Sequence, residues 1–73
     1  MEFTKGDVVR LKSNGIKMTV KYVIGVDVLP APWQVVSKVE NWQEGDCFCT
    51  WDDGKQVHEK HFSKHTIIKI NMP

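Results

Sequence analysis

Two cysteines and three histidines are the residues of this chain with the clearest capacity for chemistry. Cys47 and Cys49 are two positions apart, and His58, His61 and His65 follow them. Thiolates and imidazoles are the usual ligands of structural zinc, and alternate positions of a strand place both sulfurs on one face. One hypothesis is therefore a small zinc site formed by Cys47, Cys49, His58 and His61, with His65 as a further possible ligand.

Burial in the core is the simpler interpretation of both cysteines. A Cys-x-Cys pair departs from the Cys-x2-Cys spacing of zinc knuckles, and free cysteine is among the most frequently buried residue types. The histidines fit more simply at the solvent edge of a polar turn. A cysteine–histidine nucleophile would also need a cleft that excludes water, which a domain this small rarely has. We therefore expect a protein that is not an enzyme, with no cofactor and no small-molecule substrate.

The length of the chain limits it to one domain. Its 73 residues, of which 41% are hydrophobic and 26% charged, suit a single globular unit over residues 1–73. No apolar stretch approaches the roughly 20 residues of a membrane span, and no secretory signal follows Met1. We expect a cytoplasmic protein without membrane contact, in which both cysteines are reduced.

Short strands are the elements that must position these residues. Alternation and β-branched residues predict strands at 7–12, 18–24, 34–39, 46–51, 56–59 and 66–70. Residues 52–55, Asp-Asp-Gly-Lys, are typical of a hairpin turn, and residues 61–65 are predicted to form a short helical turn. The expected fold is mostly β: a small SH3-like barrel of five to six short antiparallel strands with one short helical turn.

The two-residue period of a strand assigns side chains to faces. The even positions from Met18 to Ile24 are expected on one face of their strand. Trp51 shares a face with Cys47 and Cys49 and is most simply a core residue. Phe48 points to the opposite face and is a candidate exposed residue.

An inserted loop or strand segment is predicted at about 26–45. Leu29-Pro30-Ala31-Pro32 cannot continue a central strand, because proline lacks the N–H group that the sheet needs. The segment contains Trp33 and Trp42, at positions where aromatic residues either cap a small core or form a contact surface. The leading hypothesis is a binding module in which Trp33, Trp42 and Phe48 engage a protein partner or a second copy of the chain.

Charge is unevenly distributed along the sequence. The net charge is +1, yet residues 1–25 carry +3, residues 26–53 carry −5 and residues 54–73 carry +3. If the first and last strands pair, as is common in SH3-like barrels, the two basic parts combine into one patch. An alternative hypothesis is weak nucleic-acid binding through a basic face of the first two strands, formed by Arg10, Lys12, Lys17 and Lys21. A solvated face is the simpler interpretation, since the near-neutral chain lacks the strongly basic character of a dedicated nucleic-acid binder.

Several short motifs carry a resemblance to a known family. They are Phe3, Gly6-Asp7-Val8-Val9, Leu11-Lys12-Ser13, Gly15, Met18-Thr19-Val20, Cys49-x-Trp51 and Gly54. In these residues the chain resembles the YodC-like family of small bacterial and phage proteins, over residues 3–23 and 47–62. It differs from the family pattern at Ile16, where proline is typical, and in the longer segment at 26–45. The opening also resembles KOW-type SH3-like domains. Both resemblances imply a compact barrel.

Overall fold

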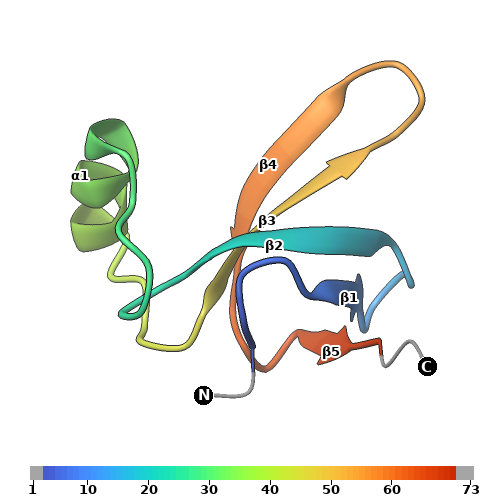
Figure 1. Ribbon diagram of the computed structural model, residues 1–73, viewed down its shortest axis with the longest axis horizontal. Coiled ribbons are helices and arrows are strands. Elements are labelled where there is room, and N and C mark those ends of the chain that lie inside the picture. Colours follow the sequence, from blue (N-terminus) through green and yellow to red (C-terminus); the bar gives the residue numbers. More distant parts are fainter. Residues whose placement is uncertain (1–2, 71–73) are drawn as a thin grey trace.

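Five antiparallel strands and one short helix form the protein. The computed structural model describes residues 3–70. The elements are β1 (Val8–Leu11), β2 (Lys17–Val23), α1 (Ala31–Val39), β3 (Cys47–Asp52), β4 (Val57–Phe62) and β5 (Ile67–Lys69). The strands form one sheet in the order β4-β3-β2-β1-β5, with α1 at one end of the molecule (Figure 1). The predicted mostly β fold is confirmed. Within residues 3–70, no helix has the length and apolar content needed to cross a membrane.

Strand pairing joins the two ends of the chain. β5 pairs antiparallel with β1, with Ile67 opposite Leu11 and Lys69 opposite Val9. The β3–β4 hairpin closes at the predicted Asp-Gly turn, where Gly54 adopts a φ of 92°. The N–H of Gly54 donates a 2.7 Å hydrogen bond to Asp52 Oδ1. Glycine suits this turn because it adopts a positive φ without steric cost.

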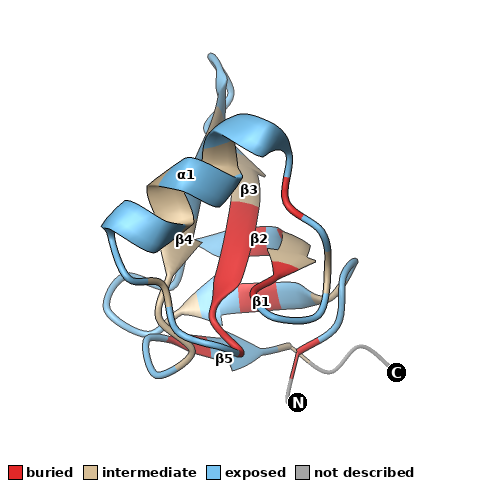
Figure 2. Cartoon of the chain, turned by 90° about the vertical axis from the view of Figure 1, so that its left-hand side faces the viewer, coloured by how far each residue is buried: buried red, intermediate tan, exposed pale blue. Residues whose placement is uncertain are grey.

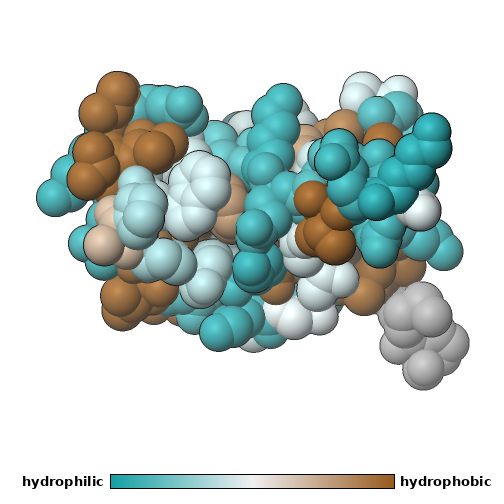
Figure 3. Space-filling view, turned by 90° about the horizontal axis from the view of Figure 1, so that it is seen from above, coloured by the Kyte–Doolittle hydropathy of each residue, from teal (hydrophilic) through white to brown (hydrophobic). Residues whose placement is uncertain are grey.

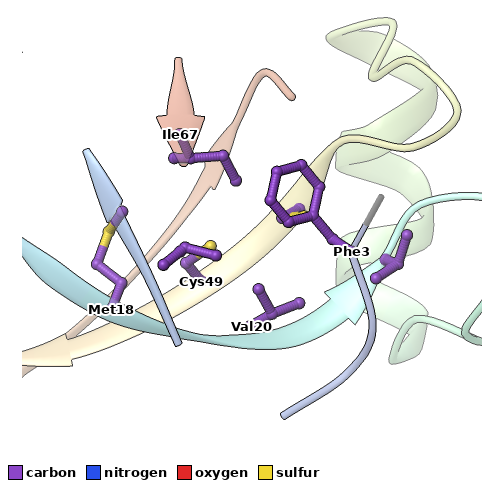
Figure 4. Packing of buried hydrophobic residues seen from close by; sticks show 8 residues of the cluster. Phe3, Met18, Val20, Cys49 and Ile67 are labelled. Atoms are coloured by element: carbon purple, nitrogen blue, oxygen red, sulfur yellow. The ribbon is translucent and has the colours of Figure 1, made fainter. Parts of the chain in front are cut away.

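The main core lies on one face of the curved sheet. It consists of Phe3, Val9, Met18, Val20, Val23, Cys47, Cys49 and Ile67, whose side chains converge from strands and the N-terminal segment (Figure 4). Both cysteines are free thiols with no exposed surface, so they contribute as small apolar side chains. Full burial of each valine in this cluster contributes about 1.5–3 kcal/mol relative to an exposed position.

A β-bulge changes the faces predicted for β2. The register between β2 and β3 shifts between Val20 and Tyr22, so Val20 pairs with Cys49 and Tyr22 with Phe48. An extra residue in one strand reverses the alternation beyond it. Val23 therefore enters the core, whereas Tyr22 lies on the opposite face beside Phe48. The prediction that all even positions from Met18 to Ile24 share one face was wrong beyond Val20.

The segment predicted as a loop or strand at 26–45 contains helix α1 instead. Pro30 precedes the first helical turn and Pro32 lies within it, where a missing N–H costs nothing. These prolines therefore start a helix, and the strand predicted at 34–39 was wrong. Asn41 ends the helix with a φ of 57°, and Trp42 N–H donates to Ser37 O at 2.9 Å. This is the Schellman arrangement of a helix C-terminus.

The segment leaves and rejoins the sheet at adjacent points. Ile24 N–H donates to Asp46 O at 2.8 Å, and Gly45 N–H donates to Ile24 O at 2.9 Å. Helix α1 has no fully buried residue, whereas the first half of β3, behind it, is buried (Figure 2).

The helical turn predicted at 61–65 is also absent. His61 and Phe62 continue β4, and residues 63–66 form a tight turn in which Thr66 N–H donates to Ser63 O at 2.9 Å. Pairing of Phe62 with Cys47 extends the hairpin beyond the predicted end at Glu59.

Candidate functional site

Aromatic rings from three parts of the chain gather between α1 and the outer face of the sheet. Trp33 belongs to α1, Trp42 follows it, and Phe48 belongs to β3. The centroid of the Phe48 ring lies 4.7 Å from that of Trp33 and 5.9 Å from that of Trp42, and the two indoles are 6.3 Å apart. The structure therefore brings together the three residues predicted to bind a partner. We call Trp33, Trp42 and Phe48, together with Tyr22 and His61, the aromatic cluster.

Phe48 forms the floor of this cluster. Because Cys47 and Cys49 face the main core, the residue between them must face α1. Phe48 is only 1% exposed, so its predicted exposure was wrong: the two tryptophans cover it. Trp33 and Trp42 are themselves half-buried and keep part of their surface open to solvent.

A buried carboxylate fixes the position of His61 and, through it, Trp42. The His61 and Trp42 rings stack with centroids 4.4 Å apart and an interplanar angle of 5°. His61 Nε2 lies 2.8 Å from Asp46 Oδ2, which also accepts a 3.0 Å hydrogen bond from Gln43 N–H, while Asp46 Oδ1 accepts one from Lys64 N–H at 3.0 Å. Asp46 thus holds together the residues after α1, the end of β4 and the turn before β5.

The electrostatic state of Asp46 follows from these contacts. Burial opposes ionisation, but hydrogen bonds from Lys64 N–H, His61 and Gln43 N–H outweigh it and hold the pKa of Asp46 below its usual value. The carboxylate is therefore ionised at neutral pH even though its side chain is only 4% exposed.

The aromatic cluster borders a groove of about 240 Å³. The lining residues are Trp33, Val36, Glu40, Trp42, Phe48, Glu59, Lys60 and His61. Glu40 Oε1 accepts a 2.8 Å hydrogen bond from Trp42 Nε1, and Glu59 forms an ion pair with Lys21. The groove therefore combines an aromatic floor with a charged rim.

Exposed apolar side chains adjoin the groove on α1. Val35 is 63% exposed and Val39, one helical turn later, is 80% exposed. Figure 3 shows hydrophobic side chains gathered at the end of the molecule that carries α1. We call Val35, Val39 and the groove-lining residues Trp33, Val36 and Trp42 the helix surface.

The structure separates the residues of the predicted zinc site. Cys47 and Cys49 face the core, His61 binds Asp46, and His58 stacks on Trp51 with its Nε2 2.7 Å from Asp53 Oδ2. No group of three or more His, Cys, Asp or Glu side chains within residues 3–70 is arranged to hold a metal ion. The hydrogen bond with Cys47 and burial both raise the pKa of Cys49, which disfavours the thiolate that a metal or a nucleophilic mechanism requires.

The predicted basic face is divided. Arg10 and Lys17 lie directly opposite each other on β1 and β2, and both are exposed. Lys21 instead pairs with Glu59, whose hydrogen bond is the main cause of the raised pKa of Lys21. Lys12 follows β1, and its N–H donates to Thr66 O beside β5. Of the four residues, Lys21 thus has an acidic partner, whereas Arg10, Lys12 and Lys17 are exposed.

Sequence reasoning missed several groove residues. Val36 and Glu40 reach the groove because 31–39 is helical, which the proline-rich start of that segment could have indicated. His61 was considered as a metal ligand or as a residue at the solvent edge of a turn, and Asp46 was not considered. Their contact spans 15 positions, and no local motif indicates it.

Comparison with known proteins identifies a family whose model matches most of the chain. The model of a family described as "Uncharacterized small protein (DUF2158)" matches residues 4–67. No curated protein and no solved structure matches the chain.

Proposed function

Since the chain belongs to this family of uncharacterized small proteins, whose description names no activity, we propose its function from the groove and the helix beside it. The protein is a non-enzymatic module that binds a protein partner through the helix surface. A second copy of the chain is the alternative occupant of the same surface.

The observation that carries this proposal is the incomplete burial of α1. None of its nine residues is buried, although Trp33 packs on Phe48 and although Val35 and Val39 are apolar. A helix that served only to cover Phe48 would need apolar residues only on the side that faces Phe48. The outward valines beside two half-exposed indoles provide a further apolar area for another protein to cover.

The composition of the surface suits a protein interface. Tryptophan dominates the energetics of many interfaces because a rigid, large ring buries much area at little entropic cost. Here two indoles are held in place by Phe48 and His61, so little ordering is needed on binding. Glu40 and Glu59 supply the polar rim that surrounds the apolar centre of a typical interface.

The strand arrangement and the cysteines support a finer fold assignment and a location. The pairing of β1 with β5 and the strand order support an SH3-like barrel, and the motif residues support a YodC-like relationship. Two buried, unpaired thiols favour a reducing, cytoplasmic location.

The test uses exposed positions whose change leaves the core intact. Val35→Lys with Val39→Lys places two charges on the helix surface, and Val57→Lys, at a 65% exposed residue of β4, is the matched control. The mass of each protein is measured by sedimentation over a concentration series, and partners retained from the natural source are quantified. We expect the double variant to lose the dimer or the partner, and Val57→Lys to keep it.

Two outcomes would contradict the proposal. One is a monomeric wild-type protein that retains no partner. The other is a partner or dimer that both variants retain equally. Trp42→Ala serves as a second probe, because it removes an indole of the groove without adding charge.

A further inference from the structure

A second surface lies on the other face of the sheet from the aromatic cluster. Leu11, Trp51 and Phe62 pack against the main core but remain half-buried. The rings of Trp51 and Phe62 have centroids 5.9 Å apart. Lys60, which also lines the groove beside the aromatic cluster, has its Nζ 5.9 Å from the centroid of Phe62. Aromatic rings and an ammonium group therefore alternate along this side of the β3–β4 hairpin.

Two adjoining hollows continue this surface toward β5. The first, of about 410 Å³, is lined by Phe62, Leu11, Lys12 and His65 together with two hydroxyl residues. The second, of about 500 Å³, shares Lys12 and His65 and adds Lys64 and Lys69 above an apolar floor. Because they share lining residues, the hollows form one path from Phe62 to the outer edge of β5.

The charge of this path is positive. Among residues 3–70, no aspartate or glutamate lines either hollow. Lys64 Nζ donates to the backbone oxygen of Glu44, so its charge is not neutralised by that contact. Lys69, in contrast, forms an ion pair, since its Nζ lies 3.4 Å from Asp7 Oδ2. Lys12 and His65 are exposed at the junction of the two hollows.

We propose that this path binds single-stranded nucleic acid. The bases of the strand stack on Phe62, beside Trp51, whose ring already stacks with His58, and its phosphates contact Lys12, Lys60 and Lys64. Aromatic platforms beside a basic track are the arrangement by which proteins bind unpaired strands with little sequence preference. The rings are recessed at the margin of the core, so only an unstacked base reaches them, and a duplex keeps its bases out of reach.

The salt dependence follows from the number of phosphates. Contacts to about three phosphates give a slope of about −2 in a plot of log Kobs against log salt concentration, at about −0.7 per contact. Between about 50 and 200 mM salt, affinity is then expected to fall roughly 20-fold. Loss of one lysine contact reduces the steepness by about 0.7.

The experiment measures binding to the full chain by the fluorescence anisotropy of labelled nucleic acids. The probes are an oligothymidylate and an oligouridylate of about 12 nucleotides, and a duplex of equal length. Lys12→Gln removes a charge on the path, and Lys55→Gln removes the same charge from the exposed β3–β4 turn. Phe62→Leu removes the ring but keeps an apolar side chain. We expect weaker binding and a shallower slope for Lys12→Gln, about tenfold weaker binding for Phe62→Leu, and no change for Lys55→Gln.

Several results would overturn the proposal. They are absence of binding at low salt, equal effects of Lys12→Gln and Lys55→Gln, affinity independent of salt, and a duplex that binds as tightly as the single strands. Because Lys12 is exposed, Lys12→Gln remains informative even if Phe62→Leu fails to fold. The Trp42→Ala variant, which adds no charge, should bind nucleic acid normally, so failure of the helix-surface proposal is distinguishable from failure of this one.

Discussion

Replacing Asp46 by asparagine should destabilise the protein strongly at neutral pH. The carboxylate accepts one hydrogen bond on Oδ1 and two on Oδ2, and its side chain is almost fully buried. Asparagine has nearly the same shape, but its NH₂ group cannot accept. Either Lys64 N–H or Gln43 N–H therefore loses its acceptor, whereas His61 Nε2 can accept from the new NH₂ group in its other tautomer.

The magnitude follows from the hydrogen bonds that asparagine cannot accept. A hydrogen bond to a charged group contributes about 1.5–3 kcal/mol, and a buried N–H group without a partner costs about 1–3 kcal/mol. We expect the free energy of unfolding to fall by about 2–4 kcal/mol. A chain of this length has a total of about 4–11 kcal/mol, so the melting temperature should fall by about 10–30 °C.

The pH dependence provides a second readout. The pKa of Asp46 is lower in the folded protein than the unfolded value of about 3.9, so its stabilisation is complete above that value and disappears as the pH falls through the folded pKa. The difference between wild type and Asp46→Asn should therefore be largest at neutral pH and should narrow in acid.

Urea denaturation followed by circular dichroism at a series of pH values measures both effects. Asp53→Asn is the control, because Asp53 also accepts hydrogen bonds from two backbone N–H groups and contacts a histidine but is exposed to water. It should change stability much less. The reasoning fails if Asp46→Asn is as stable as wild type at neutral pH, or if its deficit stays constant as the pH is lowered.

Three further predictions concern the core, a turn and the helix end. Cys47 and Cys49 should react with a thiol reagent only at the rate of global unfolding, measured by labelling with and without urea; fast labelling of the native protein would contradict their burial. The hydrogen bond with His58, with help from backbone N–H groups, lowers the pKa of Asp53 to about 2, so an NMR titration should find that value and His58→Ala should raise it. Asn41→Ala should lower stability by about 1 kcal/mol in thermal denaturation because of its left-handed backbone, whereas Asn41→Gly should not.

The strands could largely be predicted from sequence because alternation is a local property. The structure agrees with the sequence prediction at the Asp-Gly turn, at both buried cysteines and in the pairing of the first and last strands. The bulge after Val20 could not be predicted, since it depends on how β2 meets β3. The reversal of Tyr22 and Val23 follows from that one extra residue.

Helix α1 was missed because valine favours strands in isolation. Val35, Val36 and Val39 gave 34–39 a strand-like composition, but Pro30 and Pro32 begin a helix, and Phe48 provides the surface on which Trp33 packs. Trp33, Trp42 and Phe48 were predicted as partner-binding residues from their positions in the sequence, but their packing against one another was not predicted. The roles of Asp46 and His61 were not predicted either, because they depend on contacts between distant parts of the chain.

The hydrogen bonds between Ile24 and residues 45–46 make the intervening segment exchangeable in principle. They close the sheet at the base of the segment, so its length can change at a small entropic cost without moving the strands. A replacement would need apolar side chains in place of Leu29 and of the two tryptophans on Phe48, and a donor to Asp46 in place of Gln43 N–H. Variation within a lineage of such proteins, or a designed graft, can therefore change the segment that covers Phe48 while the five-stranded sheet stays the same.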